Sequence, residues 1–116
     1  MSPKRKAKTI RGTYRITEME LWDQDYVDAE VEAYIEFPKD GLGRFQFGYI
    51  RGWTDGRDVV RDELPAIEWS WQGRDEGGGD DVCGRGWATL QADGTLTGRI
   101  YLHRGDDSSF EAEPRS

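Results

Sequence analysis

Apolar residues occupy every second position along much of the chain, a pattern typical of β-strands that bury one face. Between residues 27 and 37 the alternate apolar positions are Val27, Ala29, Val31, Ala33, Ile35 and Phe37. The same spacing places three further sets on one face each: Phe45, Phe47, Tyr49 and Trp53, then Ile67, Trp69 and Trp71, then Leu96, Gly98, Ile100 and Leu102. The pattern predicts an all-β domain of antiparallel strands.

Asp-Gly pairs stand between these runs at 40–41, 55–56 and 93–94. Glycine adopts positive φ angles at little cost, so these pairs are typical of tight hairpin turns. We therefore expect about seven or eight strands joined in sequence as a meander. Closure into a small barrel would leave no exposed sheet edge, which favours a barrel, and a two-sheet β-sandwich is the alternative.

Two segments depart from the simple alternation. Residues 23–30 also fit a helical face and predict one short helix at an end of the sheet. Residues 31–37 contain β-branched and aromatic side chains that favour a strand. In the first strand the apolar phase changes between Ile16 and Met19, which predicts a β-bulge or a corner.

The hydrophobic pattern also predicts which residues lie opposite each other, because opposed residues of an antiparallel pair share a face. A three-residue loop at 92–94 pairs Leu90 with Leu96, and a three-residue loop at 105–107 pairs Leu102 with Phe110. The first of these registers brings Cys83 beside His103, although the two residues are distant in the sequence. The second register places Ser109 on the other side of His103.

The last three strands present their polar face through Cys83, Arg85, Trp87, Arg99, Tyr101 and His103. The aliphatic residues take the opposite face, so we expect this one to be an outer, solvated surface. If the barrel instead turned it inward, arginines, a thiol and an imidazole would line a polar pocket, since a small barrel can enclose one ligand.

Charge divides the chain into a basic start and an acidic body. Six basic residues precede Glu18, the first acidic one, whereas the whole chain has 16 basic and 23 acidic residues. We expect residues 1–9 to be a disordered basic tail and residues 10–113 to form a single barrel domain. The acidic body favours a basic protein partner and disfavours nucleic acid, apart from weak contacts through the tail.

No apolar run approaches the roughly 18 residues that a membrane-spanning helix needs. The basic start has no apolar stretch behind it, so it is not a secretory signal. Cys83 is the single cysteine and cannot form an internal disulfide. These features predict a cytoplasmic protein without a membrane partner.

Three groups of residues are candidates for binding or chemistry. The segment 73–84 is predicted to be a long acidic loop that carries Asp75, Glu76, Asp80 and Asp81 around three glycines. Such a loop suits a basic protein surface or calcium. Trp69 and Trp71 could line a lumen that holds a small ligand. Cys83 beside His103 could supply a nucleophile or two metal ligands, but a metal needs two more and the chain has no other Cys or His.

The favoured interpretation is a soluble binding module that contacts a protein through its acidic surface and the loop at 73–82. One alternative is a small ligand bound in the barrel lumen. Another is an enzyme or a metal site that uses Cys83 and His103 or the acidic loop. We expect a binding protein rather than an enzyme, with no cofactor and no metal. Arg85, Arg99 and Tyr101 complete the candidate binding residues.

Two motifs carry a resemblance to a known group. W-x-G-x-D-E occurs at residues 71–76, and H-x-G-D-D-S-x-F occurs at residues 103–110. Over residues 10–112 the chain resembles a widespread group of small, uncharacterised bacterial proteins, and this resemblance implies no catalytic residues. The Gly12-x-Tyr14 pair is distantly similar to the Gly-x-Trp opening of lipocalin-type barrels, which implies a similarity of architecture alone.

Overall fold

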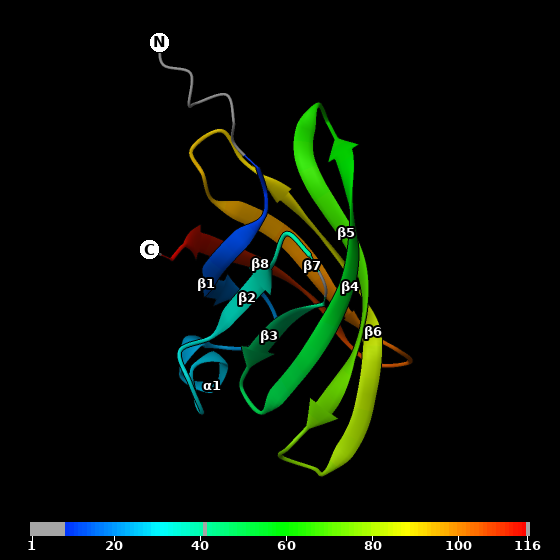
Figure 1. The fold of residues 1–116 in the computed structure, drawn as a ribbon. Helices are drawn as coiled ribbons and strands as arrows, with labels where there is room; N and C mark the ends of the chain where they lie inside the picture. The colour runs from blue at the N-terminus through cyan, green and yellow to red at the C-terminus, as the bar shows by residue number, and fades with distance from the viewer. Residues whose placement is uncertain (1–8, 41, 116) are drawn as a thin grey trace.

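A computed structural model of the protein describes residues 9–40 and 42–115, which form a closed antiparallel barrel of eight strands with one short helix. Each strand pairs with the next one in sequence, and β8 returns to β1 (Figure 1). The two-sheet sandwich is therefore wrong, and the predicted meander closed into a barrel is confirmed. The elements in chain order are β1 (Gly12–Met19), α1 (Gln24–Val27), β2 (Tyr34–Phe37), β3 (Gly43–Phe47), β4 (Ile50–Arg61), β5 (Leu64–Asp75), β6 (Asp80–Leu90), β7 (Leu96–Leu102) and β8 (Asp107–Pro114).

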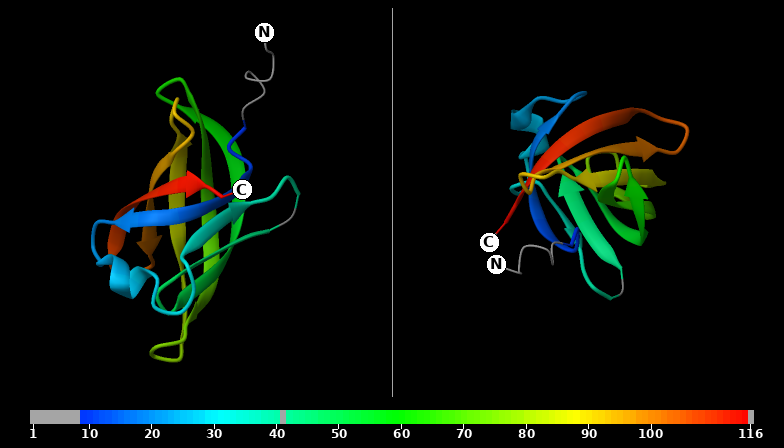
Figure 2. Two further views of the ribbon diagram at one scale, coloured as in Figure 1. Left: turned by 90° about the vertical axis from the view of Figure 1, so that its left-hand side faces the viewer. Right: turned by 90° about the horizontal axis from the view of Figure 1, so that it is seen from above.

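The strands differ greatly in length, and this difference shapes the outer surface. β4, β5 and β6 are the long strands and run side by side, while β1 and β8 run across their direction (Figure 2). The predicted basic tail falls on residues 1–8, outside the described residues, and on Thr9, which is exposed. Ile10, the next residue, is buried in the core.

The short helix predicted within 23–30 is confirmed as α1. Asp23 caps its first turn, and the Asp23 carboxylate accepts the Tyr26 N–H at 3.1 Å. The strand expected over 31–37 begins only at Tyr34, because the Asp28 carboxylate accepts the Ala33 N–H at 2.8 Å and holds the chain in a bend. Burial raises the pKa of Asp28, but hydrogen bonds from Ala33 and Gln24 outweigh it and leave the pKa below its usual value.

Large aromatic side chains packed against glycines fill the barrel interior. The rings of Phe45 and Trp71 meet edge to face with centroids 5.0 Å apart, and those of Phe37 and Trp69 lie 5.1 Å apart. A Cβ at Gly52 would lie 2.8 Å from Trp71 and 2.9 Å from Phe45, so glycine provides the space for both rings. Trp69 and Trp71, the expected lining of a ligand lumen, are therefore core residues.

The predicted turn at Asp55-Gly56 is wrong. Both residues lie inside β4, where Asp55 pairs with Ser70 and Gly56 pairs with Trp69. The turn comes later, at Asp62 and Glu63, whose φ angles are 51° and 67°. The side chain of Ile67 packs where a Gly56 Cβ would stand, so this glycine serves packing within the sheet and does not form a turn.

The register between β6 and β7 is confirmed, with Leu90 opposite Leu96 and Gly84 opposite Leu102. The register predicted between β7 and β8 is wrong. Residues 103–105 form the loop, and the Leu102 N–H donates to the Asp106 carbonyl at 2.9 Å.

The shift of the β8 register by four residues has a packing cause. Phe110 lies opposite Gly98, and a Cβ at Gly98 would come within 2.8 Å of the Phe110 ring. Only glycine leaves room for that ring, whereas the predicted partner Leu102 would not. An even shift keeps every side chain on its predicted face, but it places Ser109 opposite Arg99 and not beside His103. The bulge in β1 is confirmed between Ile16 and Glu18.

Candidate functional site

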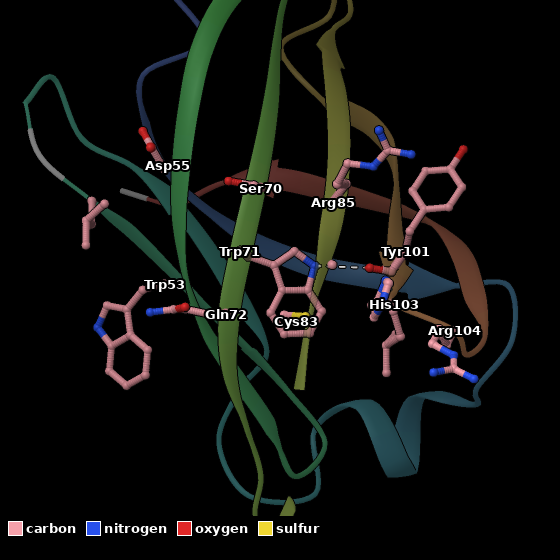
Figure 3. Close-up of a pocket in the computed structure, with 13 residues that line it drawn as sticks. Trp53, Asp55, Ser70, Trp71, Gln72, Cys83, Arg85, Tyr101, His103 and Arg104 are labelled. Carbon is pink, nitrogen blue, oxygen red and sulfur yellow. Dashed lines mark hydrogen bonds between the residues drawn. The ribbon is translucent and has the colours of Figure 1, made fainter. Parts of the chain in front are cut away.

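Outward-facing residues of β4–β7 surround a hollow of about 720 Å³. The ladder places Trp53, Gln72 and Cys83 side by side on three neighbouring strands. The His103 N–H donates to the Cys83 carbonyl at 2.7 Å, so these two residues are neighbours as predicted. Trp53 stands on one side of the hollow and His103 on the other, with Gln72 and Cys83 between them (Figure 3).

The hollow lies on the outside of the barrel, as expected for the polar face of the last strands. Cys83, Arg85, Tyr101 and His103 are all exposed. The alternative, in which this face would enclose a polar lumen, is therefore wrong.

Exposed apolar side chains gather at this hollow. Trp53 is 46% exposed, Tyr101 is 39% exposed, and Leu42 is 61% exposed. The sequence pattern placed Trp53 in the core because it continued the alternation from Phe47. The tight turn at Gly48, with a φ of 59°, changes the phase, so that Ile50 is buried and Trp53 faces outward.

A glycine sets the base of the hollow. The Trp71 indole N–H donates to the Tyr101 carbonyl at 3.2 Å (Figure 3). A Cβ at Gly84 would collide with that carbonyl and lie 3.0 Å from the indole nitrogen. Trp71 thus belongs to the core and also closes the base of the hollow.

Two smaller hollows adjoin the first one. One of about 580 Å³ shares Trp53, Gln72 and Cys83 with it, and one of about 420 Å³ shares Arg85 and Tyr101. We call the combined surface the outer trough, and its floor follows the outward residues of β6, which are Asp81, Cys83, Arg85 and Trp87. The floor from Asp81 to Trp87 spans six residue steps of extended strand, a length of about 20 Å.

The predicted long acidic loop is wrong. β5 continues to Asp75 and β6 begins at Asp80, so only residues 76–79 connect them. The strands extend this far because oppositely charged side chains pair between them. The Arg74 guanidinium lies 3.1 Å from Asp81, and Arg74 and Asp81 are directly opposed in the ladder.

Most carboxylates at this tip already form ion pairs or hydrogen bonds with neighbouring groups. Arg51 lies 2.9 Å from Glu76 and Arg74 lies 3.5 Å from it, and the hydrogen bond from Arg51 holds the pKa of Glu76 below its usual value. The Asp75 carboxylate accepts the Gly77 N–H at 3.0 Å. No group of three or more His, Cys, Asp or Glu within residues 9–40 and 42–115 is arranged to hold a metal ion.

Arginines on the outer face fall into two classes. Arg99 lies 2.6 Å from Asp107 and 3.2 Å from Glu20, and Arg61 stacks 4.0 Å over the Trp87 ring. These contacts stabilise the protein itself, so Arg99 is not an available binding residue. Arg85 and Arg104 line the first hollow and form no ion pair with any described residue.

Sequence reasoning thus identified part of the site. The structure brings together Cys83, Arg85, Tyr101 and His103, and it places Asp75, Glu76, Asp80 and Asp81 at or beside the β5–β6 tip. The polar and exposed apolar side chains of the first hollow that the sequence did not predict are Leu42, Trp53, Asp55, Ser70, Gln72 and Arg104. No side-chain hydrogen bond joins the thiol of Cys83 to the imidazole of His103 in the described structure, so the nucleophile alternative gains no support from geometry.

Comparisons of the chain with protein-family models, curated proteins and solved structures found no match. α1 has four residues, and no helix in the described part of the chain is long and apolar enough to cross a membrane. A barrel fold supports many functions, so the function has to be argued from the chemistry of the outer trough.

Proposed function

We propose that the protein is a protein-binding module and that the outer trough is its interaction surface. The observation that carries this proposal is the concentration of Trp53, Tyr101 and Leu42 beside Arg85 and Arg104 in one hollow. Tryptophan, tyrosine and arginine are the residues that most often dominate the binding energy of protein interfaces. Three of the seven large apolar side chains exposed in the described structure lie here.

The shape of the outer trough favours an extended segment of the partner. A floor of about 20 Å matches six residues of extended chain. The other two surfaces suggested by the sequence are less suitable. The barrel interior is filled by Trp69, Trp71 and their neighbours, and Glu76 and Asp81 at the β5–β6 tip are already paired with arginines.

A peptide selection tests this proposal. Random peptides of about twelve residues, twice the length that the trough accommodates, are selected on the wild-type protein. The recovered peptides are then measured on the variant Trp53→Ser/Tyr101→Ser. We expect peptides that bind the wild type and lose at least about tenfold in affinity on this variant, because it removes two aromatic contacts.

The matched control is Leu21→Ser/Val31→Ser, which removes two apolar side chains of similar exposure, 46% and 43%, outside the trough. It is expected to bind the selected peptides as the wild type does, and circular dichroism confirms that both variants are folded. A failure to select any peptide would contradict the proposal. Equal affinity of the selected peptides for the wild type and the trough variant would contradict it as well.

A further inference from the structure

Resting on the proposed function, we infer that the segment bound in the outer trough is acidic and that Arg85 and Arg104 bind its carboxylates. The net charge of −7 predicts a basic partner for the molecule as a whole. The outer trough differs from the rest of this acidic surface because it holds two arginines without a carboxylate partner among the described residues, Arg85 and Arg104.

Few of the arginines that the structure describes lack a carboxylate partner. Most described arginines already have a carboxylate within 4 Å, and the exceptions are Arg57, Arg85 and Arg104. Two of these three line the same hollow. In a protein with more carboxylates than cations, two unpaired guanidiniums in one hollow point to a charge that comes from outside the molecule.

The surroundings of these arginines make a carboxylate the fitting ligand. Arg85 lies opposite Tyr101 in the ladder, and Arg104 belongs to the adjoining loop with a φ of 59° (Figure 3). A partner that covers Trp53 and Tyr101 also removes water from the nearby guanidiniums. Guanidinium binds a carboxylate with two parallel hydrogen bonds, whereas a neutral or basic segment would leave both cations without a partner.

The remaining charges of the outer trough disfavour a polyanion. Asp55 lines the same hollow as Arg85 and Arg104. The other arginines of the trough line the two adjoining hollows and are already paired with carboxylates there, Arg51 with Glu76, Arg61 with Glu68, and Arg74 with Glu76 and Asp81. A single-stranded nucleic acid carries a phosphate at every nucleotide, and the phosphates beyond Arg85 and Arg104 would meet Asp55 or arginines that are already paired. An acidic peptide can place its carboxylates at Arg85 and Arg104 alone.

The experiment uses the peptides selected on the wild-type protein. Each acidic residue of a peptide is replaced by its amide, Glu by Gln or Asp by Asn, and both forms are titrated against the wild type, Arg85→Gln, Arg104→Gln and Arg57→Gln. Arg57 is the matched control, because it is exposed and unpaired but lines none of the three hollows.

We expect one amide replacement to weaken binding to the wild type by about tenfold, the typical effect of a lost charge-assisted hydrogen bond. The same replacement should cost less than about twofold on Arg85→Gln or on Arg104→Gln, and the full tenfold on Arg57→Gln. The non-additivity would link a given carboxylate to a given arginine.

The outcomes separate the inference from the proposed function. If peptides bind in the trough and their amide forms bind equally well, the inference of an acidic segment is wrong, whereas the proposal that the trough binds proteins is retained. If no peptide binds, or if the trough variant retains the peptides, the proposed function fails and the inference with it. An oligothymidine that binds more tightly than the peptides, and that loses this binding on Arg85→Gln, would also overturn the inference that the ligand is an acidic peptide.

Discussion

Trp71→Ala is expected to lower the free energy of unfolding by about 3–5 kcal/mol, whereas Trp53→Ala lowers it by less than about 1 kcal/mol. Trp71 is 3% exposed, packs edge to face on Phe45 and donates its indole N–H to the Tyr101 carbonyl. Trp53 faces the opposite way and is 46% exposed. The same chemical change therefore removes a core residue in one variant and a surface residue in the other.

Urea denaturation followed by far-ultraviolet circular dichroism measures both values, because fluorescence would change with the loss of a tryptophan. Both side chains line the same hollow, so the comparison tests which of them belongs to the core. Equal losses in the two variants would contradict the assignment of the inner and outer faces of β4 and β5.

Gly86→Val is expected to lower the free energy of unfolding by about 3 kcal/mol or more. A Cβ at Gly86 would overlap the Trp69 ring and lie 2.9 Å from the Arg99 carbonyl. The ring cannot move away, because Phe37 and Phe110 lie beside it with centroids at 5.1 and 6.5 Å. The side chain must therefore distort the barrel where β6 pairs with its neighbours.

Gly105→Ala is the control for this change. A Cβ at Gly105 would lie 3.4 Å from its nearest neighbour, the Cβ of Leu102, which is an ordinary contact. We expect a change within about 0.5 kcal/mol. Thermal and urea denaturation compare both variants with the wild type. A Gly86→Val protein as stable as the Gly105→Ala protein would show that the interior has unused space beside Trp69.

The barrel could be predicted because strict alternation of apolar and polar residues shows to which face of the sheet each side chain points. The pairing of Leu90 with Leu96 followed from these face assignments and from Gly94, whose φ is 92° in the turn. The pairing of β7 with β8 needed more. Every even shift preserves the faces, and the choice among them rests on whether the Phe110 ring fits over Gly98.

The site was harder to predict than the fold for a related reason. Trp53 continued an apparent alternation from Phe47, and only the turn at Gly48 changes its face. The acidic segment was interpreted as a loop because aspartate and glycine favour turns. Pairing of Arg74 with Asp81 across two strands extends the sheet instead. The first error arises from one turn that interrupts the alternation, and the second from a contact between two strands that a local pattern does not relate.

The alkylation rate of Cys83 tests most directly whether the outer trough is the binding surface. Cys83 is the single cysteine of the chain, is exposed, and lies between Trp53 and His103 on the trough floor. With a selected peptide at ten times its dissociation constant, we expect iodoacetamide to react about tenfold more slowly, because about one site in eleven stays free. A scrambled peptide should leave the rate unchanged. An unchanged rate at saturation with the selected peptide would contradict binding in the outer trough.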